Sequence, residues 1–318
     1  MSLQRTSLYA AIAISLSLTA CGGSSSGTSS SNVSFDASDL IANEASAIIT
    51  ATYTDLNDAA VALQTAVDAL NDGDATEADL DAAQEAWKAA REPWEQSEGF
   101  LFGPVDAAGI DPAIDSWPLN TADLASYIAN NPNVTAQDLA SVSEDLKGFH
   151  AIEYLLFGDG ENSNDQTVIE LDGNEIAYLV AATGDFQSNT QTLADAWITD
   201  FNGNGAYADL LTSAGSNTTY TSQGAVIEEL VNGIAGIADE VANAKMAEPY
   251  GASLADADTT LVESQYSWNS LTDFHNNLQS ILNAYTGQLG YAPDNDSISD
   301  TLNGLYAFVF AHDTTLAN

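Results

Sequence analysis

Apolar residues recur at helical intervals along the N-terminal part of the chain. Between residues 37 and 70 they follow steps of three, four and seven, which gathers them on one face of a helix. The positions concerned are Ile41, Ile48, Thr52, Leu56, Leu63, Val67 and Leu70. This pattern predicts a long amphipathic helix that ends at Asn71-Asp72-Gly73, because Asn, Asp and Gly favour turns.

The same periodicity continues in both halves of the chain. One helix is predicted to begin after Thr76 and to end near Pro93 or Gly99, and another to span 135–158. A long connection rich in Gly and Pro, 103–133, separates them. Later helices are expected over 175–197, 222–247 and 268–285, and a last one uses Leu302, Leu305, Tyr306 and Val309.

These segments predict an all-α protein with seven or eight long helices, because no alternating pattern of comparable length indicates a strand. The segment 158–166, rich in Gly, Asn and Asp, is the best internal boundary. We therefore expect two four-helix-bundle-like domains, the first over residues 36–160 and the second over residues 161–318.

The N-terminus has the features of a secretory signal. The apolar run 8–18 is too short to cross a bilayer, and it leads into a Leu-Thr-Ala-Cys sequence that ends at Cys21. Cys21 is the only cysteine and matches the processing site of a bacterial lipoprotein, where the thiol is lipidated. Residues 1–20 are thus interpreted as a signal peptide and 21–35 as a flexible Gly/Ser tether. A cleaved, soluble secreted protein is the alternative.

The residue after the cysteine is Gly22, which resembles lipoprotein signals that sort to the outer membrane. The expected location is therefore the outer membrane, facing the periplasm or the cell surface, with the lipid on Cys21 as the contact with the membrane.

Acidic residues dominate the composition, with 46 Asp and Glu against five Lys and Arg and a formal net charge of −41. Nucleic acid is excluded as a partner, because no positive surface exists to neutralise phosphates. Such a surface would attract cations, although acidic surfaces also keep proteins soluble in salty media. The basic residues that remain after the signal are Lys88, Arg91, Lys147 and Lys245.

One of these basic residues lies on an aromatic stripe. Trp87, Arg91, Trp94 and Glu98 are separated by steps of four, three and four, so they share one face of the second predicted helix. The tryptophans indicate that this face is buried, and buried charges are costly unless paired. We therefore expect Arg91 to be buried and paired with Glu98 or with Glu95.

A second group of polar residues lies in the apolar segment 148–158. His150 and Glu153 are one helical turn apart, so the imidazole and the carboxylate can converge on one metal ion or one proton. The alternative is a buried structural histidine whose hydrogen-bonding partner is the carboxylate. The zinc-protease pattern H-E-x-x-H is absent, so Glu98, Asp115 or a group from the second half must complete any metal site. Nitrogen and oxygen donors allow iron, zinc or calcium.

The sequence G-x-H-A-I-E-Y-L-L-F-G over 148–158 resembles the signature of the imelysin family, bacterial surface proteins linked to iron uptake and classed as candidate metallopeptidases. The segments 98–104, 115–118 and 263–274 resemble further imelysin segments, so that the resemblance covers about residues 36–315. It implies two helical bundles with a shared site between them.

The resemblance extends to individual site residues. A metal would be held by His150, Glu153 and Glu98, which would also be the catalytic residues of a peptidase. Further candidates for binding a ligand or cofactor are Arg91, Glu98, Asp115, Trp117, Ser267, Asn269 and Asp273. Simpler roles stay open: Trp117 could pack a loop, and Ser267 and Asn269 could cap a helix.

The sequence is compatible with three functions. The favoured one is a lipoprotein that binds a metal ion (iron or zinc), haem or an iron chelate for iron uptake, with iron-transport proteins as partners. The second is a metallopeptidase with His150 and Glu153 as metal ligands and another acid as general base. The third is a structural surface protein.

The lipoprotein interpretation leads to a first prediction. Cys21→Ser removes the thiol that would carry the lipid, so the variant should leave the membrane fraction and become soluble. Fractionation of cells that express parent and variant measures this. A variant that stays in the outer membrane as the parent does would show that the anchor is not at Cys21.

Overall fold

The computed structural model describes residues 35–160, 164, 166–291 and 303–312. The predicted signal peptide, Cys21, almost all of the tether and Leu302 lie outside the described residues. The prediction of an all-α protein is confirmed, since the described chain forms helices and no strand. None of the described helices combines the length and the apolar character that crossing a bilayer requires. The described residues from Asp36 onward form one compact unit.

The predicted N-terminal helix is present and ends where expected. It runs without interruption through α1 (Ser38–Asn43), a π-helical segment η1 (Glu44–Thr50) and α2 (Ala51–Leu70). The apolar positions at steps of three and four are buried, and Asn71 follows the last turn. The next helix, α3 (Glu77–Glu95), begins with a capping box in which Thr76 and Asp79 bond each other's backbone.

The connection expected over 103–133 contains three helices, which the sequence analysis did not predict. They are α4 (Pro104–Ala107), α5 (Ile110–Asp115) and α6 (Thr121–Asn130). The Gly and Pro residues mark the ends of these short helices, and α6 buries Leu124 and Ile128. The many turn-forming residues in this segment therefore made its short helices, of one to three turns, difficult to predict.

The prediction of a single helix over 135–158 is wrong, because the helix is interrupted twice. The segment forms α7 (Ala136–Leu139), a 3-10 turn η3 (Glu144–Leu146) and α8 (Gly148–Phe157). Gly148 has a φ of 76°, and a Cβ atom there would lie 2.3 Å from the carbonyl oxygen of Ile114. Only glycine fits this close approach of α8 to α5, which sets the direction of the motif helix.

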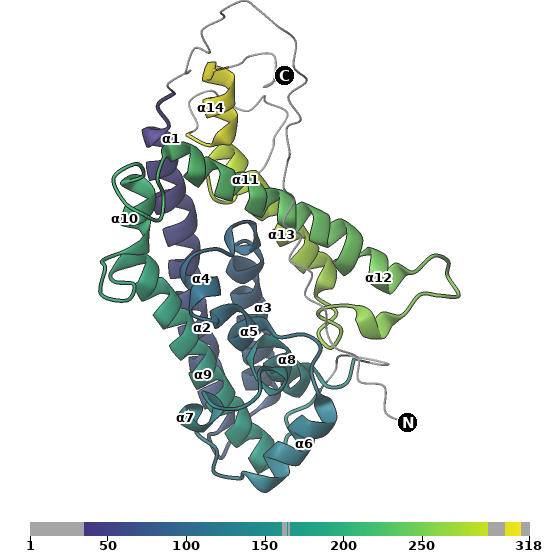
Figure 1. The fold of residues 1–318 in the computed structure, drawn as a ribbon. Helices are drawn as coiled ribbons and strands as arrows, with labels where there is room; N and C mark the ends of the chain where they lie inside the picture. The colour runs from purple at the N-terminus through teal and green to yellow at the C-terminus, as the bar shows by residue number, and fades with distance from the viewer. Residues whose placement is uncertain (1–34, 161–163, 165, 292–302, 313–318) are drawn as a thin grey trace, which may run out of the picture. The chain divides into compact units, whose positions relative to one another are not determined.

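The second half of the chain supplies the remaining helices (Figure 1). They are α9 (Gly173–Ile198), α10 (Tyr207–Thr212), α11 (Gln223–Glu240), η4 (Val241–Lys245), α12 (Ala247–Tyr250), η5 (Thr259–Leu261), α13 (Ser270–Thr286) and α14 (Leu305–His312). The sequence placed α9 in the second domain; in the structure it packs against α2 and α8. The helices α2, α3, α8 and α9 therefore enclose one core, while α11 packs along α13 and α13 contacts α3.

Aromatic rings fill the core between these helices. Phe149 of α8 lies 4.5 Å from Phe186 of α9 and 6.0 Å from Trp87 of α3, measured between ring centroids. The Trp87 indole donates a hydrogen bond of 3.0 Å to the carbonyl of Phe149. These contacts fix α8 against α3, and so place the polar motif on α8 beside the polar residues at the end of α3.

Glu44 is a buried acid without a hydrogen bond. It lies in η1, its relative exposure is 0%, and neither carboxylate oxygen has a hydrogen-bond partner among the described residues. Burial raises the pKa of Glu44 well above its usual range, because the charged form is poorly solvated there. A carboxyl group whose pKa is raised by folding contributes stability at pH values below its pKa in the unfolded chain, near 4.5. That stability is lost as the pH rises toward the pKa in the folded protein.

A second prediction follows. Glu44→Gln should gain stability relative to the parent as the pH rises from 5 to 8, by more than about 1 kcal/mol, since one pKa unit corresponds to about 1.4 kcal/mol. Urea unfolding at both pH values measures the difference. Glu228→Gln, which alters an exposed glutamate of α11, is the control and should show no such trend. Parallel pH profiles for parent and Glu44→Gln would contradict the prediction.

Candidate metal centre

Arg91 lies at the centre of the polar cluster and is completely buried. Its guanidinium forms an ion pair with Glu95, one turn further along α3, and contacts Asp115 at the end of α5 at 2.6 Å. Two acids from the second half complete its surroundings, Glu263 at 3.3 Å and Asp273 at 3.6 Å. The predicted burial of Arg91 and its pairing with Glu95 are confirmed, and the arginine joins four segments of the chain.

His150 projects from α8 into this cluster and is held on both sides. Its Nδ1 lies 3.1 Å from Oε2 of Glu153, and its Nε2 lies 3.1 Å from Oδ1 of Asp115. The other oxygen of Glu153 accepts hydrogen bonds from the backbone N–H and the hydroxyl of Ser267, at 2.8 and 2.7 Å. The Trp117 ring covers the imidazole, with 4.8 Å between centroids.

The loop before α13 contributes further polar contacts. Asp273 accepts hydrogen bonds from the Ser264 hydroxyl at 2.5 Å and from the Asn269 side chain at 2.8 Å. Asp273 is thus held one turn into α13, facing Arg91. Ser267 and Asn269, predicted as ligand-binding residues, act in this structure on Glu153 and Asp273.

Lys245 approaches the cluster from the other side, at the end of η4. Its ammonium lies 2.9 Å from Glu263, 3.0 Å from Glu98 and 3.5 Å from Glu95. Glu98 reaches this position because η2 (Glu98–Phe100) packs tightly on α11. A Cβ atom on Gly233 of α11 would lie 2.2 Å from a carbonyl oxygen of η2, so glycine permits the approach.

Two overlapping groups of side chains could hold a metal ion. One consists of Asp115, His150 and Glu263, and the other of Glu95, Glu98, Asp115 and Glu263; within each, one ligand atom per residue lies within 4.8 Å of the others. The sequence grouped His150 with Glu153 and Glu98. The structure brings all three into one cluster, but Glu98 faces Lys245, and Glu153 contacts the far nitrogen of the imidazole.

The donor set fits a metal ion. Nε2 of His150 is buried and makes no hydrogen bond, although it faces Asp115, and one oxygen of Glu263 is likewise without a hydrogen bond. Metal-binding histidines commonly give their other ring nitrogen to a carboxylate, which fixes the ring. Glu153 contacts the imidazole in this way, so the free edge of His150 points toward two carboxylates.

The charges of the cluster shift the pKa values of its members. Burial would lower the pKa of His150, but the interactions of its ring with the carboxylates of Asp115 and Glu153 outweigh this effect and raise the pKa to about 9. Burial would raise the pKa of Asp115, yet Arg91 and His150 hold it well below its usual range. The two residues therefore form a charged pair at neutral pH.

Burial has the larger effect on the acids near Lys245. It raises the pKa of Glu95 to about 8 and that of Glu98 well above its usual range, despite the nearby cations. Burial would lower the pKa of Lys245, but the charges of Glu95, Glu98 and Glu263 raise it well above its usual range. The ammonium therefore stays charged, while burial favours the protonated forms of Glu95 and Glu98.

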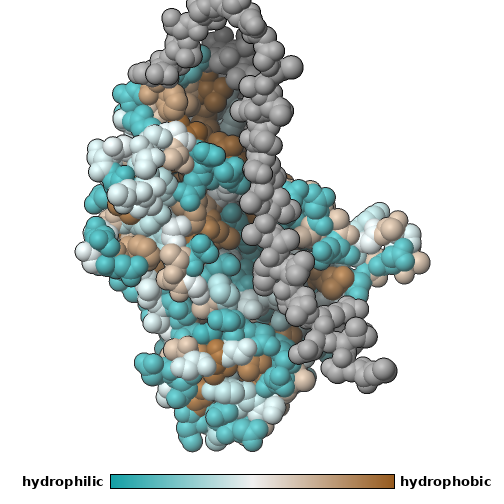
Figure 2. Space-filling model, in the orientation of Figure 1, coloured by the Kyte–Doolittle hydropathy of each residue, from teal (hydrophilic) through white to brown (hydrophobic). Residues whose placement is uncertain are grey.

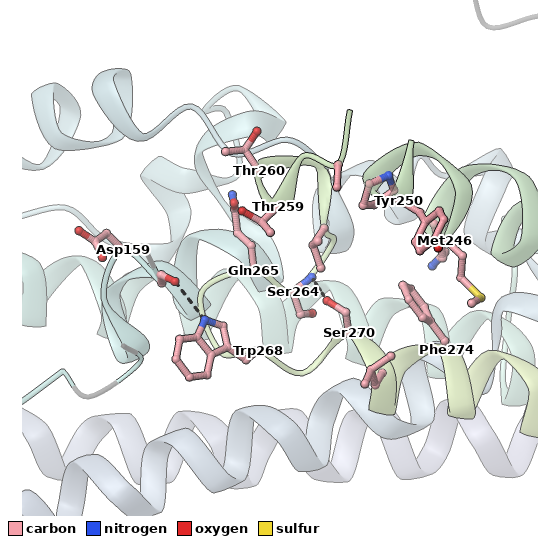
Figure 3. A pocket seen from close by; sticks show the side chains of 16 residues that line it. Asp159, Met246, Tyr250, Thr259, Thr260, Ser264, Gln265, Trp268, Ser270 and Phe274 are labelled. Atoms are coloured by element: carbon pink, nitrogen blue, oxygen red, sulfur yellow. Dashed lines mark hydrogen bonds between the residues drawn. The ribbon is translucent and has the colours of Figure 1, made fainter. Parts of the chain in front are cut away.

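A mostly apolar cavity of about 620 Å³ adjoins the cluster (Figure 3). It extends from Trp268 at one end to Met246, Tyr250 and Phe274 at the other. Lys245 and Ser264 belong to both the cavity wall and the cluster. Trp268 has a φ of 60°, and its indole donates a hydrogen bond of 3.0 Å to the carbonyl of Gly160.

Sequence reasoning missed two members of the cluster, Glu263 and Lys245. Glu263 opens the segment 263–274 that the sequence had associated with the site, and Lys245 is one of the few basic residues of the chain. The small number of basic residues was therefore the one feature of the sequence that could have indicated a role for Lys245. Nothing local in the sequence distinguishes Glu263 from the other acids.

The chain matches the model of a known protein family. The Imelysin (Peptidase_M75) family model matches residues 49–317, which include the whole cluster. The chain belongs to the imelysin family. The expected membership of the imelysin family is thereby confirmed.

Individual relatives agree with this assignment. Iron-regulated protein A of Synechococcus elongatus is 35% identical over 214 residues, which are 67% of this chain and 54% of the relative, so the match spans about half of that relative. A solved structure from Parabacteroides distasonis, described as a candidate iron-regulated protein A precursor, has a TM-score of 0.76 and 33% identity over 88% of this chain and 80% of its own. An imelysin-like protein from Psychrobacter arcticum shares the fold, with a TM-score of 0.67 and 17% identity over 89% of this chain and 81% of its own.

The geometry of Arg91 yields a third prediction. Arg91→Ala leaves several buried carboxylates without their cation, so the free energy of unfolding should fall by roughly 3–5 kcal/mol. Lys88→Ala, one turn earlier on α3, removes a partly exposed cation paired with exposed Glu85 and should change it by about 0.5 kcal/mol or less. Urea unfolding of both variants provides the comparison. Equal effects would mean that the buried ion pairs do not stabilise the fold.

Proposed function

We propose that this protein binds a metal ion, with iron foremost, through Asp115, His150 and Glu263. The observation that carries the proposal is the two-sided environment of His150. Glu153 contacts Nδ1, while Nε2 is buried, makes no hydrogen bond and faces the two carboxylates. A nitrogen and two or more oxygens suit iron and zinc. The names of the relatives, iron-regulated protein A, favour iron.

Each residue has a separate task in this proposal. Asp115 is oriented by Arg91 at 2.6 Å and by the indole N–H of Trp94 at 2.6 Å, so one carboxylate is positioned by two donors. Glu153, held by Ser267, can take the Nδ1–H of a neutral imidazole. Trp117 covers the ring and limits access of water. A bound ion would contribute positive charge that draws these donors together.

The cellular setting is part of the same proposal. A lipid on Cys21 would hold the protein at the outer membrane, and the tether would let the helical unit reach an iron-transport protein. The acidic composition, with a formal net charge of −41, supports collection of cations at the surface. On the face drawn in Figure 2, hydrophilic residues surround smaller apolar areas. Haem and iron chelates remain alternative ligands for the cavity beside the cluster.

Peptide hydrolysis is the second candidate, and the apolar cavity is the observation that favours it. The cavity could hold a side chain of an unfolded peptide next to Asp115, His150 and Glu263. A metal at these residues could then activate a water molecule. Cleavage of an unfolded peptide that stops when a chelator is added would favour this candidate, whereas tight metal binding without cleavage would favour the binding role.

The proposal predicts the behaviour of a histidine variant. His150→Ala should lose specific binding of iron(II) and zinc, since it removes the nitrogen ligand, and should keep its helical circular dichroism. Affinity of the parent should rise with pH toward 9, because neutral imidazole is the binding form and the pKa of His150 is raised to about 9.

Calorimetric titration at pH 6 and pH 8 measures both effects. The matched control is His275→Ala, which changes an exposed histidine of α13 and should bind as the parent does. If all three proteins bind equally, the acidic surface collects the ions and the proposed centre is wrong.

A further inference from the structure

The helix α13 buries a largely polar face and exposes an apolar one. It lies along α11 and packs its polar face on α3 and η2 (Figure 1). The Ser280 hydroxyl accepts a hydrogen bond of 2.8 Å from the backbone N–H of Gly99, and the Asn283 side chain donates one of 3.0 Å to that of Gln96. Because polar residues make these contacts, the larger apolar side chains of α13 lie on its other side.

Five positions on this other side have the spacing of a coiled-coil seam, with steps of four, three, four and three residues. We define the α13 seam as Leu271, His275, Leu278, Leu282 and Tyr285. The relative exposure is 80% at Leu271, 54% at Leu278 and 37% at Tyr285. The seam is about 21 Å long, since an α-helix rises about 1.5 Å per residue. A stripe of this period and width is suited to packing against one further helix.

The seam contains no acidic residue, although about one residue in seven of the chain, 46 of 318, is acidic. Between residues 264 and 291 the sequence has a single acid, Asp273, which is buried against Arg91, and it has no Lys or Arg. A basic partner would be attracted by acids, whereas a partner as acidic as this chain can approach most easily where acids are missing. Helices that lie on membranes are typically rich in Lys and Arg. The composition of this face therefore favours a second copy of the chain over a basic protein or a lipid surface.

We propose that two copies of this chain pair through their α13 seams, which run antiparallel about a twofold axis at Leu278. In this register Leu271 lies opposite Tyr285 of the second copy, and His275 lies opposite Leu282 of the second copy. Both copies then use the same five positions, as a twofold contact requires. The inference uses no residue of the proposed metal centre and is independent of the proposed function.

The antiparallel direction follows from the two ends of the seam. Exposure decreases from Leu271 to Tyr285, and Tyr285 contacts Tyr306 of α14 with 5.8 Å between ring centroids. Antiparallel pairing brings the most exposed end of one seam against the end of the other that α14 already supports. It also places the dipoles of the two helices in opposite directions, which is the favourable arrangement.

Analytical ultracentrifugation of the full chain with Cys21→Ser tests the pairing without a lipid. The chain should dimerise reversibly with a dissociation constant of about 1–100 μM, because the contact is small. Raising the sodium chloride concentration from about 0.05 M to about 1 M should lower this constant about tenfold or more, since salt screens the repulsion between two chains of formal net charge −41. A chain that stays monomeric at concentrations well above this range would overturn the inference, and so would a dimer that salt weakens.

A charged variant tests whether the seam makes the contact. Leu278→Glu, added to the Cys21→Ser chain, puts an acid at the twofold axis, where it faces its own copy, and should weaken the dimer about a hundredfold or more. Leu278 is more than half exposed, so the helical circular dichroism should be unchanged. The matched control is Val61→Glu, which adds an acid at an exposed apolar position of α2 and should dimerise as the Cys21→Ser chain does. Equal dimerisation of all three chains would place the contact elsewhere and overturn the inference.

Disulfide cross-linking tests the register, because Cys21→Ser leaves the chain without any other thiol. Leu278→Cys should form a covalent dimer on mild oxidation, since position 278 meets its own copy at the axis. Leu271→Cys alone should not, because its copy lies about 21 Å away along the helix, whereas a mixture of Leu271→Cys and Tyr285→Cys chains should cross-link. Cross-linking by Leu271→Cys alone, or none by Leu278→Cys, would overturn the antiparallel pairing. Should Leu278→Glu fail to fold, this experiment decides.

Sedimentation with phospholipid vesicles distinguishes a second copy from a membrane as the occupant of the seam. Vesicles of phosphatidylethanolamine and phosphatidylglycerol should leave the Cys21→Ser chain in the supernatant. A monomer that binds the vesicles, and loses this binding in Leu278→Glu, would assign the seam to the lipid surface and overturn the pairing.

Discussion

The buried guanidinium of Arg91 is the interaction on which the polar centre depends. It lies among Glu95, Asp115, Glu263 and Asp273, which come from α3, α5, the loop before α13 and α13 itself. These acids could not share one interior without a cation, because their mutual repulsion and lost hydration would exceed the gain from packing. The guanidinium carbon of Arg91 also lies over the Phe149 ring, 4.8 Å from its centroid. Arg91 therefore connects the polar centre with the aromatic core.

Most of the Lys and Arg side chains that the structure describes are buried and paired with carboxylates. Arg91 and Lys245 lie within the centre, and Lys147 lies 3.6 Å from Asp185 in another buried pair, while Lys88 is partly exposed. The surface consequently carries almost unopposed negative charge, and the interior holds the positive charge that orders the acids. This distribution gives the surface a negative electrostatic potential, which attracts cations from solution.

The orientation of His150 links the fold to the proposed chemistry. The close approach of α8 to α5 at Gly148 directs the motif helix, and Glu153 and Ser267 then fix one side of the imidazole. The other side faces Asp115, whose own position depends on Arg91 and Trp94. These contacts hold the imidazole in one orientation, which is the kind of support that the proposed metal centre requires of its ligands.

The sequence by itself determined the helical class, the amphipathic helices around 37–70 and 77–95, the burial of Arg91 and the family motif around His150, because these depend on periodicity and on residue types within one or two turns. Only the tertiary structure decided that the motif helix starts afresh at Gly148, since backbone contact with a distant helix causes the break. It also decided the roles of Glu263 and Lys245. Their partners lie 18 to 172 residues away in the sequence, and no local pattern indicates which of the 46 acids lie close to so few cations.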